Sequence, residues 1–162
     1  MPLLERVVAA SPERLPVLEA LADLRERQGR LPESIALLER VHRLRAPTPI
    51  DLIKLGVLAM ATTRTDLAMR SFEQARLAQG AAFKHDLELG VVYLAARRLT
   101  DARDALDRVT PSSRDYPMAL FKRAQVSVLL NELDSAARID LARRRATAAT
   151  RELIAKEALF KR

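Results

Sequence analysis

The chain has 162 residues, 49% of them hydrophobic and 30% charged, which is enough apolar sequence to bury a sizeable core. The absence of cysteine excludes disulfides and thiolate metal sites, and no apolar run approaches the roughly 20 residues of a membrane span. The formal net charge is +7, and most of the excess lies near one end, where residues 143–162 hold seven Lys or Arg and two Glu.

The first apolar segment of the chain returns 34 residues later, because Leu-Leu-Glu-Arg-Val stands at residues 3–7 and again at 37–41. Self-similarity of this length is typical of stacked two-helix units, none of which can bury its apolar face alone. The period therefore predicts an all-α solenoid whose core is built from contacts between neighbouring units.

The same step aligns the side chains that we expect to pack. In the first helix of each unit a large residue directly precedes a small one, which indicates a close helix contact. These pairs are Leu21-Ala22, Leu55-Gly56, Leu89-Gly90 and Arg123-Ala124. The second helices supply three columns: Ser34, Ala68, Ala102 and Ala136; Leu38, Phe72, Leu106 and Asp140; Val41, Ala75, Val109 and Arg143. Asp140 and Arg143 are polar in otherwise apolar columns, so the packing of the last unit is expected to differ.

Turn residues agree with the period. Gly29 and Asn131 lie between paired helices, where both residue types tolerate the positive φ of a helix end. Thr48-Pro49-Ile50-Asp51 combines an N-cap hydroxyl, a proline in the first turn and an acid three residues after the cap, which predicts a helix from Pro49. We expect first helices to begin near Leu15, Pro49, Phe83 and Pro117.

The columns resemble those of the tetratricopeptide repeat, most closely in Leu55-Gly56 with Ala68, Phe72 and Ala75, and in Leu89-Gly90-Tyr93 with Ala102 and Leu106. The resemblance covers roughly residues 3–150. It implies a right-handed superhelical solenoid of stacked antiparallel helix pairs. The expected repeats are 15–48, 49–82, 83–116 and a divergent fourth at 117–150.

The two ends are expected to differ from the repeats. Residues 1–14 match the second helix of a preceding unit and are interpreted as its remnant or as an N-terminal cap. Residues 151–162, with a start near 147 as the alternative, form one apolar stripe through Leu153, Ile154, Ala158 and Leu159 and resemble the helix that covers the last repeat. This register favours a piece of a longer array; the alternative is a short protein with a half-repeat cap.

The resemblance also implies that the first helices line a concave groove, whose exposed columns hold a ligand. The groove residues are apolar except at one acidic end, and recur within each helix at spacings of three and four. They are Glu19, Asp23 and Glu26; Ile50, Ile53, Val57 and Met60; Leu87, Val91 and Leu94; Phe121, Gln125 and Val128. The acidic trio is expected to attract basic residues of a ligand. The alternative is that neighbouring helices or the C-terminal helix cover the stripe.

The sequence supplies no catalytic constellation. The two histidines, His42 and His85, belong to different units, and the scattered glycines form no phosphate loop. We therefore expect no enzyme activity, no catalytic residue, no metal site and no cofactor.

These observations favour a non-catalytic scaffold that binds a helical or extended peptide in an apolar groove, as part of a larger assembly and, from its Ala, Leu and Arg bias, a bacterial one. Homo-oligomerisation is the alternative, since open ends can stack on another copy. Nucleic-acid binding is disfavoured, because basic and stacking aromatic side chains do not line the groove. The compartment and the partner's identity are not encoded. The basic tip, which comprises Arg143, Arg144, Arg145, Arg151, Lys156, Lys161 and Arg162, is interpreted as a solvated cap, with an anionic partner as the alternative.

Overall fold

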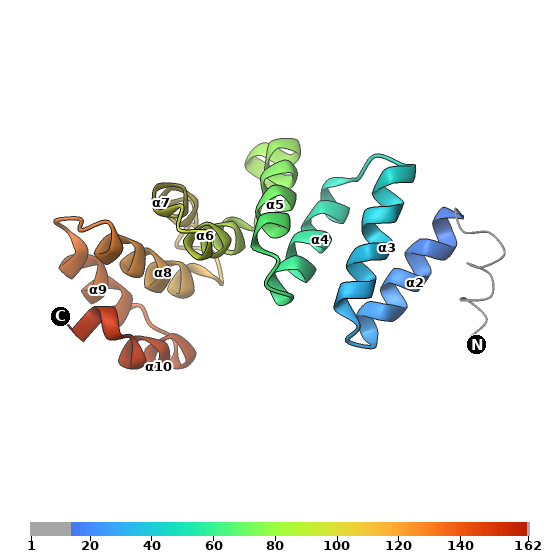
Figure 1. The fold of residues 1–162 in the computed structure, drawn as a ribbon. Helices are drawn as coiled ribbons and strands as arrows, with labels where there is room; N and C mark the ends of the chain where they lie inside the picture. Colours follow the sequence, from blue (N-terminus) through green and yellow to red (C-terminus); the bar gives the residue numbers. More distant parts are fainter. Residues whose placement is uncertain (1–13, 162) are drawn as a thin grey trace. The chain divides into compact units, whose positions relative to one another are not determined.

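The computed structural model describes residues 14–161, which form α-helices and short 3₁₀ turns with no strand among them. The chain divides after Phe83 into two compact units. The first unit contains α2 (Leu15–Arg27), α3 (Leu31–Leu44), α4 (Pro49–Ala61) and α5 (Thr65–Gln79), with a 3₁₀ turn at Gly80–Ala82. The second contains α6 (Asp86–Ala95), α7 (Leu99–Asp107), α8 (Tyr116–Leu129), α9 (Ser135–Arg144) and α10 (Ala148–Lys156), followed by a 3₁₀ turn at Ala158–Lys161 (Figure 1). The all-α prediction is confirmed, whereas the expected remnant at 1–14 lies, apart from Arg14, outside the described residues.

Helix starts follow the local sequence in most units. The α4 helix begins at Pro49 with the predicted capping box, in which the side chains of Thr48 and Asp51 satisfy each other's backbone N–H groups. The expected helix start near Phe83 is wrong, because α6 begins at Asp86. The backbone at Phe83 is extended and its side chain is buried, so this residue anchors the connection instead of opening the helix.

Four helix ends share one geometry at intervals of 34 residues. Positive φ occurs at Gly29, Thr63, Arg97 and Asn131. At each end the next residue's N–H donates to the carbonyl five residues before it, as in Arg30 N to Arg25 O at 2.9 Å and Arg64 N to Ala59 O at 2.8 Å. This is the Schellman arrangement, which satisfies carbonyls left free at a helix end. Gly29 and Asn131 adopt the predicted positive φ. Thr63 and Arg97 occupy the equivalent positions of the 34-residue period, so the period by itself predicts positive φ there as well.

Packing within the first three helix pairs, and on the first helix of the fourth, follows the predicted columns. Leu21, Leu55, Leu89 and Arg123 are all buried, as are the small residues that follow them. A Cβ atom at Gly56 would lie 2.9 Å from the Phe72 ring, which shows how closely α4 and α5 approach. Between α2 and α3 the Ser34 hydroxyl donates to Ala22 O at 2.9 Å, so the small polar residue in this column is satisfied. The glycine and alanine columns are therefore helix contacts.

The second helix of the fourth unit departs from the columns. Ala136, Asp140 and Arg143 are exposed on α9, whereas Ala142 is buried with Ile139 packed beside it. The expectation that Ala136 packs like Ala68 and Ala102 is thus wrong. Because Asp140 and Arg143 would lose water in the ordinary register, α9 presents a different face to the core. An open cavity of about 280 Å³ remains here, lined by residues of α7, α8 and α9 and of the α7–α8 connection.

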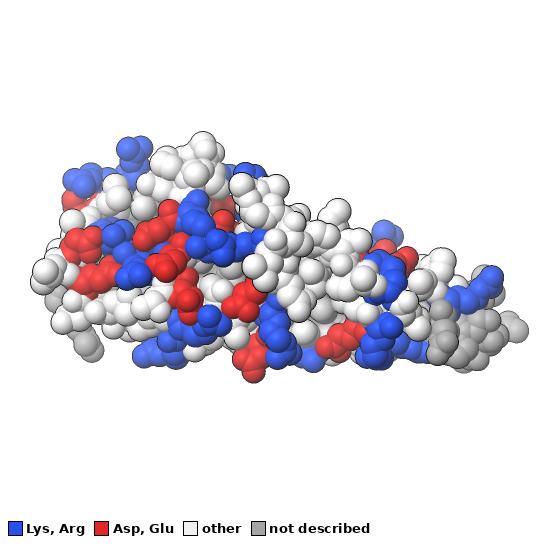
Figure 2. Space-filling view, turned by 90° about the horizontal axis from the view of Figure 1, so that it is seen from above, with Lys and Arg blue, Asp and Glu red and all other residues white. Residues whose placement is uncertain are grey.

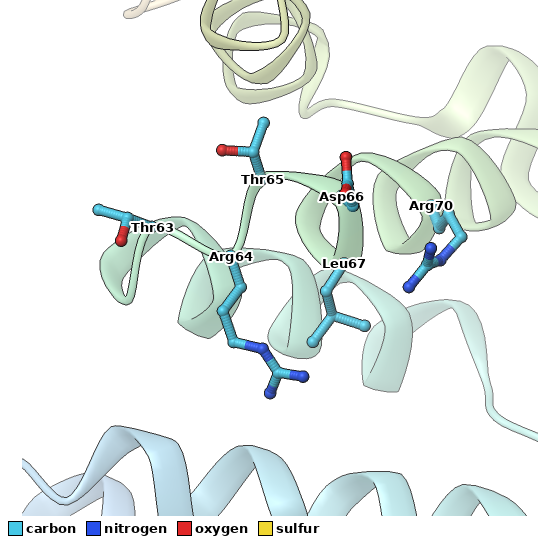
Figure 3. Close-up of a pocket in the computed structure, with 6 residues that line it drawn as sticks. All are labelled: Thr63, Arg64, Thr65, Asp66, Leu67 and Arg70. Carbon is cyan, nitrogen blue, oxygen red and sulfur yellow. The ribbon is translucent and has the colours of Figure 1, made fainter.

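Replacing Thr63 by glycine is expected to raise the free energy of unfolding by about 0.5–1 kcal/mol. The left-handed conformation costs a β-branched residue about 1–2 kcal/mol, and part of this gain is offset by the greater freedom of glycine in the unfolded chain. Thr63 lies in the exposed α4–α5 turn (Figure 3), where its hydroxyl contacts only the Thr62 carbonyl. Urea unfolding measures the change. Thr62→Gly is the matched control, expected to destabilise because Thr62 has negative φ and its hydroxyl donates to Leu58 O; equal losses in both variants would contradict the assignment.

Candidate partner-binding surface

In the first unit, α4 carries several apolar residues that are exposed or half-buried along one side of the helix. Ile50 is 74% exposed and Val57 is 45% exposed, with Ile53 and Met60 half-buried on the same side of the helix. Leu52, Leu55, Leu58 and Ala59 face the opposite way and are buried. The α4 helix is therefore apolar on both faces but packs only one of them within its unit. We call Ile50, Ile53, Val57 and Met60 the α4 stripe.

The acidic trio of α2 has partners within the chain. Lys54 of α4 donates to Asp23 and lies 3.0 Å from Glu26, and Arg45 lies 2.8 Å from Glu19. Burial alone would lower the pKa of Lys54, but hydrogen bonds to Asp23 and Glu26 outweigh it and raise the pKa. That these carboxylates attract a basic ligand stays a prediction, and such a ligand would compete with Lys54 and Arg45 for them. Reversing Glu19 or Asp23 to lysine would place like charges together.

Asp51 joins three elements at the start of α4. Its Oδ2 accepts from Thr48 N at 2.8 Å, from the Thr48 hydroxyl at 2.8 Å and from Arg45 Nη1 at 2.7 Å, while Arg45 also reaches Glu19 on α2. The hydrogen bond from Arg45 holds the pKa of Asp51 well below its ordinary value, despite the opposing effect of burial. These bonds fix the first turn of α4, and with it the position of Ile50 and Ile53.

Asp51→Asn is expected to lower the free energy of unfolding by about 1–2 kcal/mol at pH 7, because it removes the charge that Arg45 and the capping box hold. The native pKa of Asp51 lies below its unfolded value of about 3.9, so its stabilisation is complete above about pH 4 and declines as pH falls toward the native pKa. The difference between wild type and variant should therefore narrow below pH 4 in urea titrations.

Asp66→Asn is the matched control for Asp51, because it removes an exposed first-turn carboxylate of α5 at the same formal charge change. Its effect should stay within a few tenths of a kcal/mol at every pH. A cost for Asp51→Asn that is constant from pH 7 to pH 2 would contradict the charged network.

The second unit places its predicted groove residues in two different environments. Leu87, Val91 and Leu94 of α6 are half-buried. Phe121 of α8 is only 3% exposed, and it packs with Ile154 and Phe160. The expectation that Phe121 lies on an open surface is wrong, because the residues after α10 cover it. Val128 packs against the same cluster, and the Gln125 amide donates to Glu157.

The sequence pattern did not identify several residues of these surfaces. Lys54 and Arg45 pair across elements whose approach no local pattern encodes. Phe160 lies outside the expected stripe of the C-terminal helix, of which Ile154 is buried while Leu153 and Ala158 are exposed. Only its residue type indicated that Phe160 is buried, since the chain has only four phenylalanines and such residues are rarely left exposed.

Charge is interspersed on the face shown in Figure 2, where acidic and basic side chains alternate. Within the described part of the basic tip all six cations are exposed, and Arg144 and Lys156 pair with Asp140 at 2.8 Å and Glu152 at 2.6 Å. A shallow hollow at the start of α5 has mostly polar residues around it (Figure 3). Neither feature adds a defined binding geometry to the α4 stripe.

The histidines lie apart. His42 is half-buried on α3, where burial lowers its pKa, and His85 is the residue before α6, with its Nδ1 3.4 Å from Glu88. Over residues 14–161, no group of three or more acidic or histidine side chains is placed to hold a metal ion. The helices in that range are also too short or too polar to cross a bilayer.

Comparison with known proteins places this fold. Residues 53–117 match the sequence model of the tetratricopeptide repeat. No curated protein matches the sequence at a significant level.

Similar solved structures include YrrB, described as a TPR protein with an unusual peptide-binding site (15% identity, TM-score 0.67, 89% of this chain and 75% of that one). MamA has 15% identity and a TM-score of 0.73 over 88% of this chain and 78% of its own. The C-terminal part of a TPR repeat-containing protein from Cytophaga hutchinsonii has 11% identity and a TM-score of 0.65, over 98% and 67%. Residues 53–117 thus match the tetratricopeptide repeat in sequence, and the chain shares the fold of these solved structures over most of its length.

Proposed function

We propose that this chain is a non-catalytic protein-interaction scaffold whose α4 stripe binds the apolar side of a helical or extended peptide. Tetratricopeptide repeats are in general scaffolds for protein–protein interaction, and catalysis is not their usual role. The proposal rests chiefly on one observation, the exposure of Ile50 and Val57 on a helix that is otherwise packed. Contiguous apolar residues facing water are typical of binding surfaces.

Charged residues border the α4 stripe and limit its apolar surface on one side. Lys54 lies on α4 beside the stripe and pairs with both Asp23 and Glu26. An open pocket of about 440 Å³ is lined by Asp23, Glu26, Arg27 and Lys54. A peptide side chain that enters this pocket would meet both signs of charge, so binding should depend only weakly on salt. Apolar burial on the stripe would then supply most of the affinity.

In the second unit, Leu87, Val91 and Leu94 of α6 are the corresponding candidates. Their half-buried side chains leave less apolar surface for a ligand than α4 does. We therefore assign them a supporting role, and assign Glu19, Asp23 and Glu26 the role of positioning Lys54 and Arg45.

The α4 stripe can be tested before any natural partner is known. Peptide-display selection against the full chain should enrich sequences with apolar residues at helical or alternating spacing. Val57→Ser should then weaken binding of the selected peptides by about 1–3 kcal/mol, or roughly 5- to 150-fold, as for a central interface residue. The free energy of unfolding should change by less than about 0.5 kcal/mol, because Val57 is already exposed.

Leu77→Ser provides the matched control, since Leu77 is 84% exposed on α5 and lies outside the stripe. It should leave peptide affinity unchanged. If Leu77→Ser and Val57→Ser weaken binding equally, or if neither does, the α4 stripe is not the binding surface. Sedimentation over a range of concentrations distinguishes the alternative, because self-association through the stripe would make the mass depend on concentration and on Val57.

A further inference from the structure

The residues after α10 fold back on α8. Phe160 is 7% exposed, and its ring meets that of Phe121 edge to face, with centroids 5.8 Å apart and an interplanar angle of 84°. Ile154 from α10 joins the same cluster, and Leu159 packs beside it. The apolar surface that Phe121 would present to solvent is thus covered by the chain's own segment 157–160.

Polar contacts also hold segment 157–160 on α8. The Gln125 amide nitrogen donates to Glu157 Oε2, while Glu157 Oε1 accepts from the backbone N–H of Leu159 at 3.0 Å. The Lys122 ammonium lies 5.1 Å from the Phe121 ring centroid and is attracted electrostatically to Glu157. One carboxylate therefore contacts an amide donor near a cation, and its second oxygen holds the turn that places Phe160.

The surface beneath is the α8 counterpart of the α4 stripe. Phe121, Gln125 and Val128 follow Ile53, Val57 and Met60 by two 34-residue periods. The stripe is open on α4, whereas segment 157–160 covers its counterpart on α8. The segment therefore occupies α8 as a bound peptide would. Gln125 Oε1 is buried with no hydrogen-bond partner among the described residues.

We propose that the α8 face is a second peptide-binding site that recognises a carboxylate followed three residues later by an aromatic side chain, and that Glu157–Phe160 occupies it as an intramolecular competitor. This rests on the proposed function, because it treats both stripes as peptide-binding surfaces. A partner segment of this chemistry must displace residues 157–160. The apparent affinity of that partner segment equals its intrinsic affinity multiplied by the fraction of molecules in which the site is open.

The chain supplies its own probe. A fluorescein-labelled peptide with the sequence of residues 152–162 should bind the full-length Phe160→Ala variant at least about tenfold more tightly than wild type in fluorescence polarisation, because the internal competitor is weakened. Two altered peptides, with alanine for the phenylalanine or glutamine for the glutamate at position 157, should bind the variant more weakly. Leu153→Ala is the matched control, since Leu153 is exposed on α10, and it should retain the affinity of wild type.

A second measurement covers the case in which Phe160→Ala unfolds. The chain has no tryptophan, so Phe160→Trp introduces a single reporter. Its emission should be blue-shifted in the free protein and move to the red when excess peptide displaces it. Leu133→Trp, at a fully exposed loop position, should show no shift.

Equal peptide affinity for wild type and Phe160→Ala, together with no shift of the reporter, would overturn the proposal. So would a wild-type mass that rises with concentration and falls in Phe160→Ala, because the segment would then sit on a second copy. Neither result depends on the α4 stripe. Conversely, loss of the α4 result with displacement intact would refute the proposed role of α4 alone.

Discussion

Replacing Gly90 by leucine is expected to lower the free energy of unfolding by about 3 kcal/mol or more, since overpacking a filled core forces backbone or side-chain shifts. A Cβ atom there would lie 2.7 Å from Leu106 Cγ and 3.5 Å from the carbonyl oxygen of Ala102. Leu106 and Ala102 are both buried, so neither can move aside without cost. Urea unfolding followed by circular dichroism measures the loss. Gly56→Leu should behave alike, because its side chain would enter the ring of the fully buried Phe72.

Controls separate overpacking from a general effect of leucine. Ala95→Leu introduces the same side chain at an exposed position of α6 and should change stability by less than about 0.5 kcal/mol. Gly90→Ala combined with Leu106→Ala should cost less than the sum of the two single changes, because alanine at 106 lacks the Cγ and Cδ2 atoms that the added Cβ would meet. Strict additivity would mean that Gly90 and Leu106 do not meet as described.

Glu132→Ala is expected to cost about 2–3 kcal/mol, because it strands the buried guanidinium of Arg123. The Arg123 side chain is 5% exposed, and it lies 2.7 Å from Glu132 and 3.0 Å from the more exposed Asp107. Removing Glu132 leaves a single, partly solvated counter-charge. Urea unfolding again provides the measurement.

Two further variants test the cause of this loss. Asp134→Asn removes an exposed partner of Arg138 and should change stability by less than about 0.5 kcal/mol. Adding Arg123→Leu to Glu132→Ala should restore stability, since it removes the stranded charge and supplies the residue type of Leu21, Leu55 and Leu89. A double variant less stable than Glu132→Ala alone would show that the loss has another origin.

The sequence determined the helical architecture and the contacts within the first three helix pairs. The period of 34 identified the glycine and alanine contacts and two of the four left-handed helix ends, because close helix packing and positive φ each select few residue types. Thr48 and Asp51 specified the start of α4 for the same reason, as the capping box uses atoms only three residues apart. The division into repeats remains a prediction of that period.

Tertiary structure decided what the surfaces present. Lys54 and Arg45 pair with the acidic trio, α9 turns a different face inward, and Phe160 covers Phe121. Each outcome depends on contacts between residues from separate elements. The repeat period does not encode which residue a long, flexible side chain pairs with. A repeat pattern fixes which residues share a column. Whether that column meets solvent, an ion pair or another segment of the chain depends on the free energy of burying it against the neighbours that the fold provides.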